Sequence, residues 1–298
     1  MGSSSSDEGV SYHTGRIEAF IRRGERIQLV LPAFPAKSSN PEKTLGILPD
    51  YGEVLALARL DRLCVQIQAV YEPGAELVIC SDGRVFSDLV QVADEAVSAY
   101  TAEIQRIIDA NGFSRLSTYN LDDLFPAGTG HDETRWALAE TYGEPIPVLR
   151  ERIAQDPDTR QLYNGIHRFL FEDLVVLHPE LSRTKVRNWS GELAYQVIQR
   201  SNAWSNLVAE RFPEAVRLSI HPQPLHSRKI GVRLVPSNNI WRTPWHSAVL
   251  FDGSRFSLVR RADAERMGAR LVRSGGFAYF EALNPMPVQR GMADVVLA

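Results

Sequence analysis

The sequence contains 298 residues, of which 44% are hydrophobic and 23% are charged. A chain of this size can bury about three quarters of the surface that it exposes when unfolded, so either one large domain or two small ones would fit. Its 33 basic and 36 acidic residues leave a net charge of −3. This near balance argues against nucleic acid or an anionic membrane surface as the main partner.

Three features of the sequence bear on the cellular compartment of the protein: its apolar runs, its N-terminal segment and its two cysteines. No apolar run reaches the ~20 residues that a membrane-spanning helix needs, and the start, MGSSSSDEGV, lacks the hydrophobic core of a secretory signal. We expect residues 1–11 to form a flexible tail. Cys64 and Cys80 have neither a metal-type nor a redox-type spacing, which is typical of buried thiols in a reducing compartment. The sequence therefore predicts a cytoplasmic protein in which residues 12–298 form a single domain.

Strands and helices alternate in the first part of the chain. Hydrophobic periodicity predicts helices at 12–23, 51–70 and 87–110, and strands at 27–31, 76–80 and 114–119. Such a βαβαβ order implies parallel strands joined by right-handed crossovers.

The second part of the chain begins with a helical block. Helices at 130–142, 146–177 and 182–211 predict a helical insertion at about 130–211. Strands are then predicted at 216–220, 230–235 (with antiparallel pairing to the preceding strand as one option), 246–251, 255–260, 270–273 and 277–281. Asp252-Gly253 is a strong hairpin signal. We therefore expect an α/β fold with a Rossmann-like, mostly parallel sheet flanked by helices, a helical insertion and a C-terminal antiparallel hairpin.

Polar residues follow the predicted parallel strands at their carboxyl ends. The prolines of residues 31–43 turn the chain out of the first strand and leave Lys37 just beyond it. Ligands bind at this edge in α/β proteins, and a lysine there can meet a phosphate or a carbonyl, although a solvated loop lysine is the commoner arrangement. Asp82 and Arg84 follow the second strand, where Asp-Gly also fits a plain turn or a helix cap.

His221 and Lys229 extend this edge from the strand at 216–220. His221 could act as an acid or base near neutral pH, although a histidine at a strand end is more often a structural, hydrogen-bonded residue. No histidine or acid spacing matches a metal motif, so we predict no metal site. Polar groups from several distant segments would share one rim of the sheet, which indicates a binding site.

The segment SRTKVR at 182–187 opens a helix with three cations. Cations at the start of a helix interact unfavourably with the helix dipole, which favours acidic residues there. A departure from such a local preference often indicates a ligand-binding site. Arg183 and Arg187 are four residues apart and share a face, where they could hold a phosphate or carboxylate. Pairing with Glu172 or Asp173 is at least as common an explanation.

Two tryptophans flank a rigid turn in the segment WRTPWH at 241–246. Trp245 and His246 could shape a pocket for an aromatic substrate, although core packing is the more common role for at least one of the two tryptophans.

Taken in order, these stretches resemble the isonitrile (isocyanide) synthase family, which also contains the fungal spore-wall dityrosine-precursor enzyme. The matching segments cover nearly the whole chain: LPAFPAKSSN (31–40), LGILPDYGE (45–53), DGRVFSD (82–88), SRTKVR (182–187), VRLSIHP (216–222), the region of Lys229 to Gly231, and WRTPWH (241–246).

The resemblance implies a Rossmann-like enzyme that converts the α-amino group of tyrosine or tryptophan into an isonitrile. Its carbon would come from C2 of ribulose 5-phosphate as co-substrate, without a metal or nicotinamide cofactor. A separate iron- and 2-oxoglutarate-dependent oxygenase would take the product. Two alternatives stay open: N-formylation of tyrosine, as in the fungal branch, and a non-catalytic protein that binds an amino acid or a sugar phosphate.

The resemblance and the residue types together suggest three kinds of role for the side chains of the site. The residues expected to contact the sugar phosphate or its carbonyl are Lys37 and Lys229. The residues expected to shuttle protons are Asp82 and His221. The residues expected to bind the phosphate and the substrate carboxylate, or to shape the aromatic pocket, are Arg84, Arg183, Arg187, Trp245 and His246.

Overall fold

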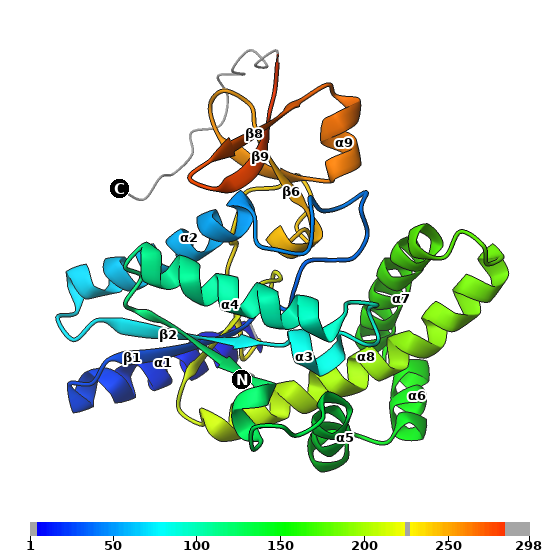
Figure 1. Cartoon of the computed structure of the whole chain (residues 1–298). Helices are drawn as coiled ribbons and strands as arrows, with labels where there is room; N and C mark the ends of the chain where they lie inside the picture. Colours follow the sequence, from blue (N-terminus) through cyan, green and yellow to red (C-terminus); the bar gives the residue numbers. More distant parts are fainter. Residues whose placement is uncertain (1–4, 224–226, 284–298) are drawn as a thin grey trace.

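A computed structural model describes residues 5–223 and 227–283, with side chains from Tyr12 onward. Its centre is a parallel sheet in the order β3-β2-β1-β4-β5 (Figure 1). The strands are β1 (Ile27–Pro32), β2 (Ala75–Ser81), β3 (Leu116–Asn120), β4 (Val216–Ser219) and β5 (Ile230–Gly231). The chain builds the sheet outward from β1 to β3 and then returns to the other side of β1. This confirms the predicted Rossmann-like, mostly parallel sheet.

The central strands are buried on both faces, as parallel sheets require. Leu29 and Leu31 of β1 belong to one hydrophobic cluster, which includes residues of helices α2 (Tyr51–Val70) and α4 (Asp94–Ala110). Val30 points the other way, into a cluster that includes Trp204 of α8 (Arg183–Arg211). The alternation of side chains along one apolar strand thus attaches helices to both faces of the sheet.

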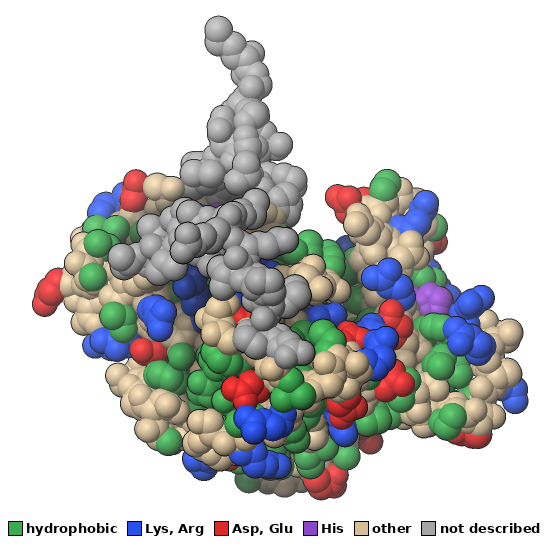
Figure 2. Space-filling view, turned by 90° about the horizontal axis from the view of Figure 1, so that it is seen from above, with side chains coloured by type: hydrophobic (Ala, Val, Ile, Leu, Met, Phe, Trp, Pro, Cys, Tyr) green, Lys and Arg blue, Asp and Glu red, His purple; other side chains and the backbone are tan. Residues whose placement is uncertain are grey.

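A group of helices separates β3 from β4, where the sequence predicts a helical insertion. Its members are α5 (His131–Tyr142), α6 (Ile146–Gln155), α7 (Pro157–Leu177) and α8. The single helix predicted at 146–177 is two helices, because Pro157 cannot donate a hydrogen bond to a preceding turn and Asp156 accepts one from the Thr159 amide as an N-cap. Seen from above, this helical part stands at the right of the molecule, beyond a notch (Figure 2).

A second, mixed sheet lies above the first in the view of Figure 1. Its order is β7-β6-β9-β8, with strands β6 (Ala248–Phe251), β7 (Phe256–Val259), β8 (Arg270–Ser274) and β9 (Phe277–Glu281), and α9 (Arg261–Arg266) between β7 and β8. The predicted antiparallel hairpin is confirmed, with Gly253 at a φ of 93° in its turn. The 3₁₀ turn η2 (Pro244–His246) leads into β6.

Several element boundaries differ from the sequence prediction. Helix α1 (Ser5–Arg23) begins inside the segment predicted as a flexible tail. It includes two glycines, Gly9 and Gly15, each of which costs a helix ~1 kcal/mol. The helix predicted from residue 87 starts only at Asp94, because Gln91 has a φ of 58° that an α-helix cannot include. The short helices α3 (Gly83–Phe86) and η1 (Leu121–Leu124) follow β2 and β3.

β5 also departs from the prediction, because it is only two residues long and pairs with β4 in parallel. Leu218 lies opposite Ile230 and Ser219 opposite Gly231, so the two strands run in the same direction. Within residues 5–223 and 227–283, none of the helices has both the length and the apolar character for crossing a bilayer.

Candidate active site

The candidate site lies where the strand order reverses, between β1 and β4, which is where open α/β sheets bind ligands. The loop after β1 reaches the segment before β6 there, and the Ser38 amide donates a hydrogen bond of 2.9 Å to the Trp245 carbonyl. Two segments from opposite ends of the sequence are therefore joined at this edge.

Lys37 is sealed inside this junction, with its side chain fully buried. Its Nζ lies 2.8 Å from Asp50 Oδ2, 2.9 Å from Glu53 Oε2 and 3.0 Å from the Pro244 carbonyl oxygen. An ammonium group has three N–H donors, so these three acceptors occupy all of them. In this arrangement Lys37 holds the start of α2 and the turn η2 together and has no N–H left for a phosphate.

The charges of this buried cluster influence one another. Burial would lower the pKa of Lys37, but the Asp50 and Glu53 carboxylates outweigh it and raise the pKa, so Lys37 stays an ammonium and is a poor Schiff-base nucleophile. Burial raises the pKa of Glu53 to about 7, and Lys37 offsets part of that rise. Tyr100 donates a hydrogen bond of 3.2 Å to Glu53 Oε1. Glu53 therefore holds a proton more readily than an exposed glutamate does.

His246 lies at the middle of the site. Its Nδ1 is 3.1 Å from Thr243 Oγ1, and its ring centroid is 4.7 Å from that of Phe169 of α7. Burial lowers the pKa of His246 well below its ordinary value, and the positive charges of Lys43, His221 and Lys37 lower it further. The imidazole is thus neutral at physiological pH and can accept a proton.

Lys43 lies near His246 and contacts helix α7. Its Nζ lies 2.6 Å from Asp173 Oδ1 and 4.4 Å from the centroid of the Phe169 ring. Asn40 also donates to Asp173, at 2.8 Å. The loop after β1 is thereby fastened to helix α7 of the insertion.

His221 and Lys229 stand on the β4 side of the same edge. Burial lowers the pKa of His221, and the neighbouring Lys229 ammonium lowers it further. His221 and Lys37 both contribute to the lowered pKa of His246, and Lys229 contributes to that of His221. Lys37 is buried, whereas Lys229 is partly exposed.

Asp82 follows β2 at the carboxyl edge of the sheet. Its Oδ1 atom is buried and has no hydrogen-bond partner among the described residues, and burial raises the pKa of Asp82 to about 7. The side chain does not cap α3, so the capping role left open by the sequence is not observed. A Cβ on Gly83 would lie 1.7 Å from the Pro35 carbonyl oxygen, so only glycine allows the start of α3 to approach the loop after β1 this closely.

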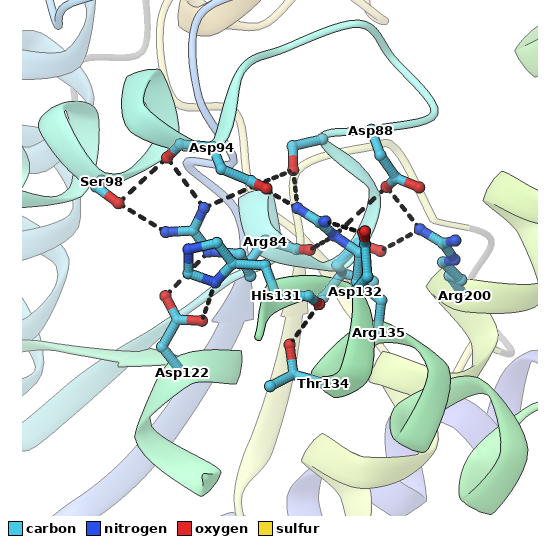
Figure 3. Close-up of polar contacts among 12 residues, drawn as sticks. Arg84, Asp88, Asp94, Ser98, Asp122, His131, Asp132, Thr134, Arg135 and Arg200 are labelled. Atoms are coloured by element: carbon cyan, nitrogen blue, oxygen red, sulfur yellow. Dashed lines mark hydrogen bonds and ion pairs between the residues drawn. The ribbon is translucent and has the colours of Figure 1, made fainter. Parts of the chain in front are cut away.

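Arg84 is held in a network of protein acceptors (Figure 3). Its guanidinium lies 3.0 Å from Asp122 Oδ2, 2.8 Å from Asp94 Oδ1 and 2.7 Å from Ser98 Oγ. Arg135 of α5 contacts the same Asp94 carboxylate and donates to the Arg84 carbonyl. Arg84, which the sequence predicts to bind substrate, thus connects α3 to α4 and η1, and Arg135 links the insertion to the same network. A cavity of about 320 Å³ lies beside Arg84.

Arg183 and Arg187 do share a face, as predicted, but they are exposed and lie over the ring of Phe171, at 5.5 and 5.6 Å. Phe169, two residues earlier in α7, faces His246. Two residues advance a helix by about 200°, so the arginines lie on the side of α7 away from His246. The acids offered as their alternative partners are engaged elsewhere, Glu172 by Arg260 and Asp173 by Lys43.

The two tryptophans of residues 241–246 have different environments. Trp245 is 2% exposed and packs on Phe34 at a centroid distance of 5.2 Å, so it belongs to the core rather than to an open pocket. Trp241 is 56% exposed, and its ring lies 4.9 Å from that of His221. Trp241 is therefore the tryptophan available to an aromatic substrate.

Sequence reasoning missed four charged residues of this edge, which are Asp50, Glu53, Lys43 and Asp173. A signal for the first two is present, since Asp50 and Glu53 form a capping box at the start of α2. Lys43 and Asp173 meet only through tertiary packing, which no local pattern reports. No group of three or more potential metal-ligating side chains gathers anywhere in the part of the chain that the structure describes; the prediction that no metal takes part stays a prediction.

Comparison with known proteins agrees with this architecture. The family model described as pyoverdine/dityrosine biosynthesis protein matches residues 17–272. The chain belongs to this family. A crystal structure of PvcA from Pseudomonas aeruginosa superposes with a TM-score of 0.86 at 40% identity, covering 94% of this chain and 92% of that one.

Two curated members of the family extend the comparison over nearly full length. L-tryptophan isonitrile synthase AmbI2 of Fischerella ambigua is 45% identical over 277 residues, 93% of this chain and 84% of that protein. L-tyrosine isonitrile synthase of Pseudomonas aeruginosa is 43% identical over 264 residues, 88% of this chain and 80% of that protein. The resemblance to the isonitrile synthase family that the sequence motifs indicate is confirmed.

Proposed function

We propose that this protein is an isonitrile synthase that acts on an aromatic L-amino acid, tyrosine or tryptophan. The observation that carries this proposal is the identity of 43–45% to two such enzymes over most of both chains. Acid and base groups of altered pKa add chemistry of the required kind, with Asp82 after β2 and His246 in the turn before β6.

Ribulose 5-phosphate is the proposed source of the isonitrile carbon. The α-amine would attack the C2 ketone of the sugar, and loss of water would give an imine. Proton transfers would then allow carbon–carbon and carbon–oxygen bonds of the sugar to break, which makes the overall reaction a condensation followed by lyase-type cleavage. This chemistry requires groups that can give and take protons at neutral pH.

Asp82 and His246 supply such groups. A carboxyl with a pKa of about 7 is present in both protonation states at neutral pH, and a neutral imidazole accepts a proton without first losing one. His221, with its lowered pKa and buried Nδ1, is a second base on the β4 side. We assign proton transfer to these three side chains and the orientation of η2, with His246, to Lys37.

Trp241 and the polar groups around it would receive the substrates. The exposed Trp241 ring offers a face on which a phenol or indole can stack, and Lys229 offers a cation next to His221 for the sugar phosphate. Trp245 would support this pocket from behind, within the core. The exposed pair Arg183 and Arg187 has no part in this assignment.

A substrate panel tests the proposal. The protein would be incubated with ribulose 5-phosphate and either tyrosine or tryptophan, and the product masses would be measured. A mass equal to that of the amino acid plus one carbon less two hydrogens identifies the isonitrile. A formamide, heavier by one water, would instead indicate N-formylation, and unchanged substrates in every arm would leave only a binding role. The inactive control is the same protein after heat denaturation.

The product and the compartment complete the proposal. An isonitrile amino acid would pass to an iron- and 2-oxoglutarate-dependent oxygenase, and the reaction would take place in the cytoplasm, where amino acids and sugar phosphates are available. The two cysteines, Cys64 and Cys80, are free thiols buried in the structure, as expected in a reducing compartment.

A further inference from the structure

Arg217 and Lys229 lie next to each other at the edge of the central sheet, where β4 pairs with β5. Leu218 of β4 pairs with Ile230 of β5 in parallel register, and Arg217 and Lys229 are the residues that precede this pair. The positive charge of Arg217 acts on Lys229, and that of Lys229 acts on His221. We refer to these three basic groups together as a row.

These cations are partly buried without a matching negative charge. Among the described residues, no carboxylate forms an ion pair with Arg217 or Lys229; the titratable groups that act on Arg217 are Cys80, Tyr12 and Arg16. Arg217 Nη2 donates to Ser205 Oγ at 2.8 Å, but the Arg217 Nε is buried and lacks a partner there. Burial lowers the pKa of both cations.

His221 adds a polar group to the end of this row. Its Nδ1 is buried without a partner among the described residues. A Cβ on Gly231 would lie 3.1 Å from the His221 carbonyl oxygen and 3.2 Å from the Gln223 amide nitrogen. The chain of β5 therefore packs directly on the backbone that follows β4, which brings Lys229 toward His221.

Unpaired buried charge and unpaired buried donors cost free energy, and a protein that retains them usually presents them to a ligand of opposite charge. A phosphomonoester carries about −1.5 to −2 charges at neutral pH, which two cations neutralise, and its three oxygens accept several hydrogen bonds. A carboxylate carries a single charge and matches this row less well. An arginine side chain presents two N–H groups in the plane that a phosphate prefers.

We propose that Arg217, Lys229 and His221 form a subsite for the phosphate group of the sugar-phosphate co-substrate. The inference rests on the proposed function, and it adds Arg217, a residue of the sheet itself, to the residues that bind substrate. In this arrangement Arg217 and Lys229 hold the phosphate oxygens, and His221, which acts electrostatically on His246, adds a third basic group to the subsite.

Binding measurements on the full-length protein test the subsite without any turnover. Isothermal titration calorimetry would use inorganic phosphate, ribulose 5-phosphate and, separately, tyrosine and tryptophan, with the wild-type chain and the variants Arg217→Met and Lys229→Met. Each variant should bind ribulose 5-phosphate about 10- to 100-fold more weakly, the loss expected for a hydrogen bond to a charged group. The dissociation constants for tyrosine and tryptophan should change by less than about threefold, because neither variant removes a proposed contact to the amino acid.

The matched control is Arg183→Met, which removes an exposed cation of α8 and should leave the affinity for ribulose 5-phosphate unchanged. Unliganded thermal unfolding provides a second readout. If Arg217 served only the fold, Arg217→Met would lower the melting temperature; an unpaired cation kept for a ligand predicts an equal or higher one, together with the loss of the stabilisation that phosphate gives the wild type. Arg217→Lys, which retains the charge, should recover part of the affinity.

Wild-type-like binding of ribulose 5-phosphate by Arg217→Met and Lys229→Met would overturn the inference, and so would a loss confined to amino acid binding. The two proposals can fail separately. If ribulose 5-phosphate binding depends on Arg217 but the wild-type protein forms no isonitrile, the proposed function is wrong and the phosphate subsite stands. If the wild-type protein forms the isonitrile but both variants bind ribulose 5-phosphate normally, the subsite is wrong and the proposed function stands.

Discussion

Replacement of Lys37 by methionine tests the buried cluster most directly. The Lys37 ammonium is fully buried between Asp50 and Glu53 at 2.8 and 2.9 Å. Lys37→Met removes the only cation in direct contact with these carboxylates among the described residues. Breaking a buried ion pair from one side costs about 3–5 kcal/mol, so we expect a loss of that size in the free energy of unfolding at pH 8.

The loss should depend on pH in a defined direction. Burial already raises the pKa of Glu53 to about 7 from an ordinary 4.5, and without Lys37 the folded-state pKa rises further. A carboxyl with a raised folded-state pKa binds protons more readily when folded, so it destabilises the protein above that pKa and ceases to do so below its unfolded value. The deficit of Lys37→Met should therefore shrink as the pH falls from 8 toward 5.

Urea unfolding followed by circular dichroism at several pH values measures this deficit. The double variant Lys37→Met/Glu53→Gln removes one of the stranded charges and should recover part of the loss at pH 8. Lys185→Met, at an exposed position of α8, is the matched control and should change stability by less than about 0.5 kcal/mol. A Lys37→Met deficit below about 1 kcal/mol, or one that grows as the pH falls, would refute the reasoning.

Three further predictions concern the site. Gly83→Ala should lower the melting temperature strongly, because its Cβ would meet the Pro35 carbonyl at 1.7 Å, whereas Gly46→Ala, with open space around it, should not; comparable melting temperatures would contradict this. The pH profile of kcat/KM should show an inflection near 7 from Asp82, and its persistence in Asp82→Asn would exclude that assignment. His246→Ala should lower kcat by about 10²–10⁴-fold, the range for general acid–base groups, with unchanged circular dichroism; a kcat within tenfold of wild type would remove His246 from the chemistry.

Local sequence signals were sufficient for much of the fold. Helix α2 has the predicted bounds, Tyr51–Val70, because an apolar stripe and a capping box agree. The hairpin turn at Asp252-Gly253 was predictable because glycine supplies the positive φ that the turn uses. The parallel arrangement of the strands was also predictable, because the βαβαβ order of the elements implies it.

The partners of the site residues were not predictable in the same way. Arg84 follows β2 as an anion-binding residue would, but Asp122 of η1 and Asp94 of α4 hold it, and these pairings form only after β3 and the insertion are in place. Trp241 and Trp245 have similar surroundings in sequence, yet one is exposed and the other is core. Periodicity reports which face of an element is apolar, and it does not report which distant side chain arrives there.

The hydrogen bond from Lys37 to the Pro244 carbonyl spans 207 positions of sequence. Chains emerge from the ribosome with the N-terminal part first, so the ammonium and its two carboxylates are made long before the turn that carries His246. A nascent chain, or one cut before residue 243, would lack both the last acceptor of Lys37 and the central imidazole. The hydrogen bonds that join the two segments of this edge can thus form only after Pro244 has been synthesised.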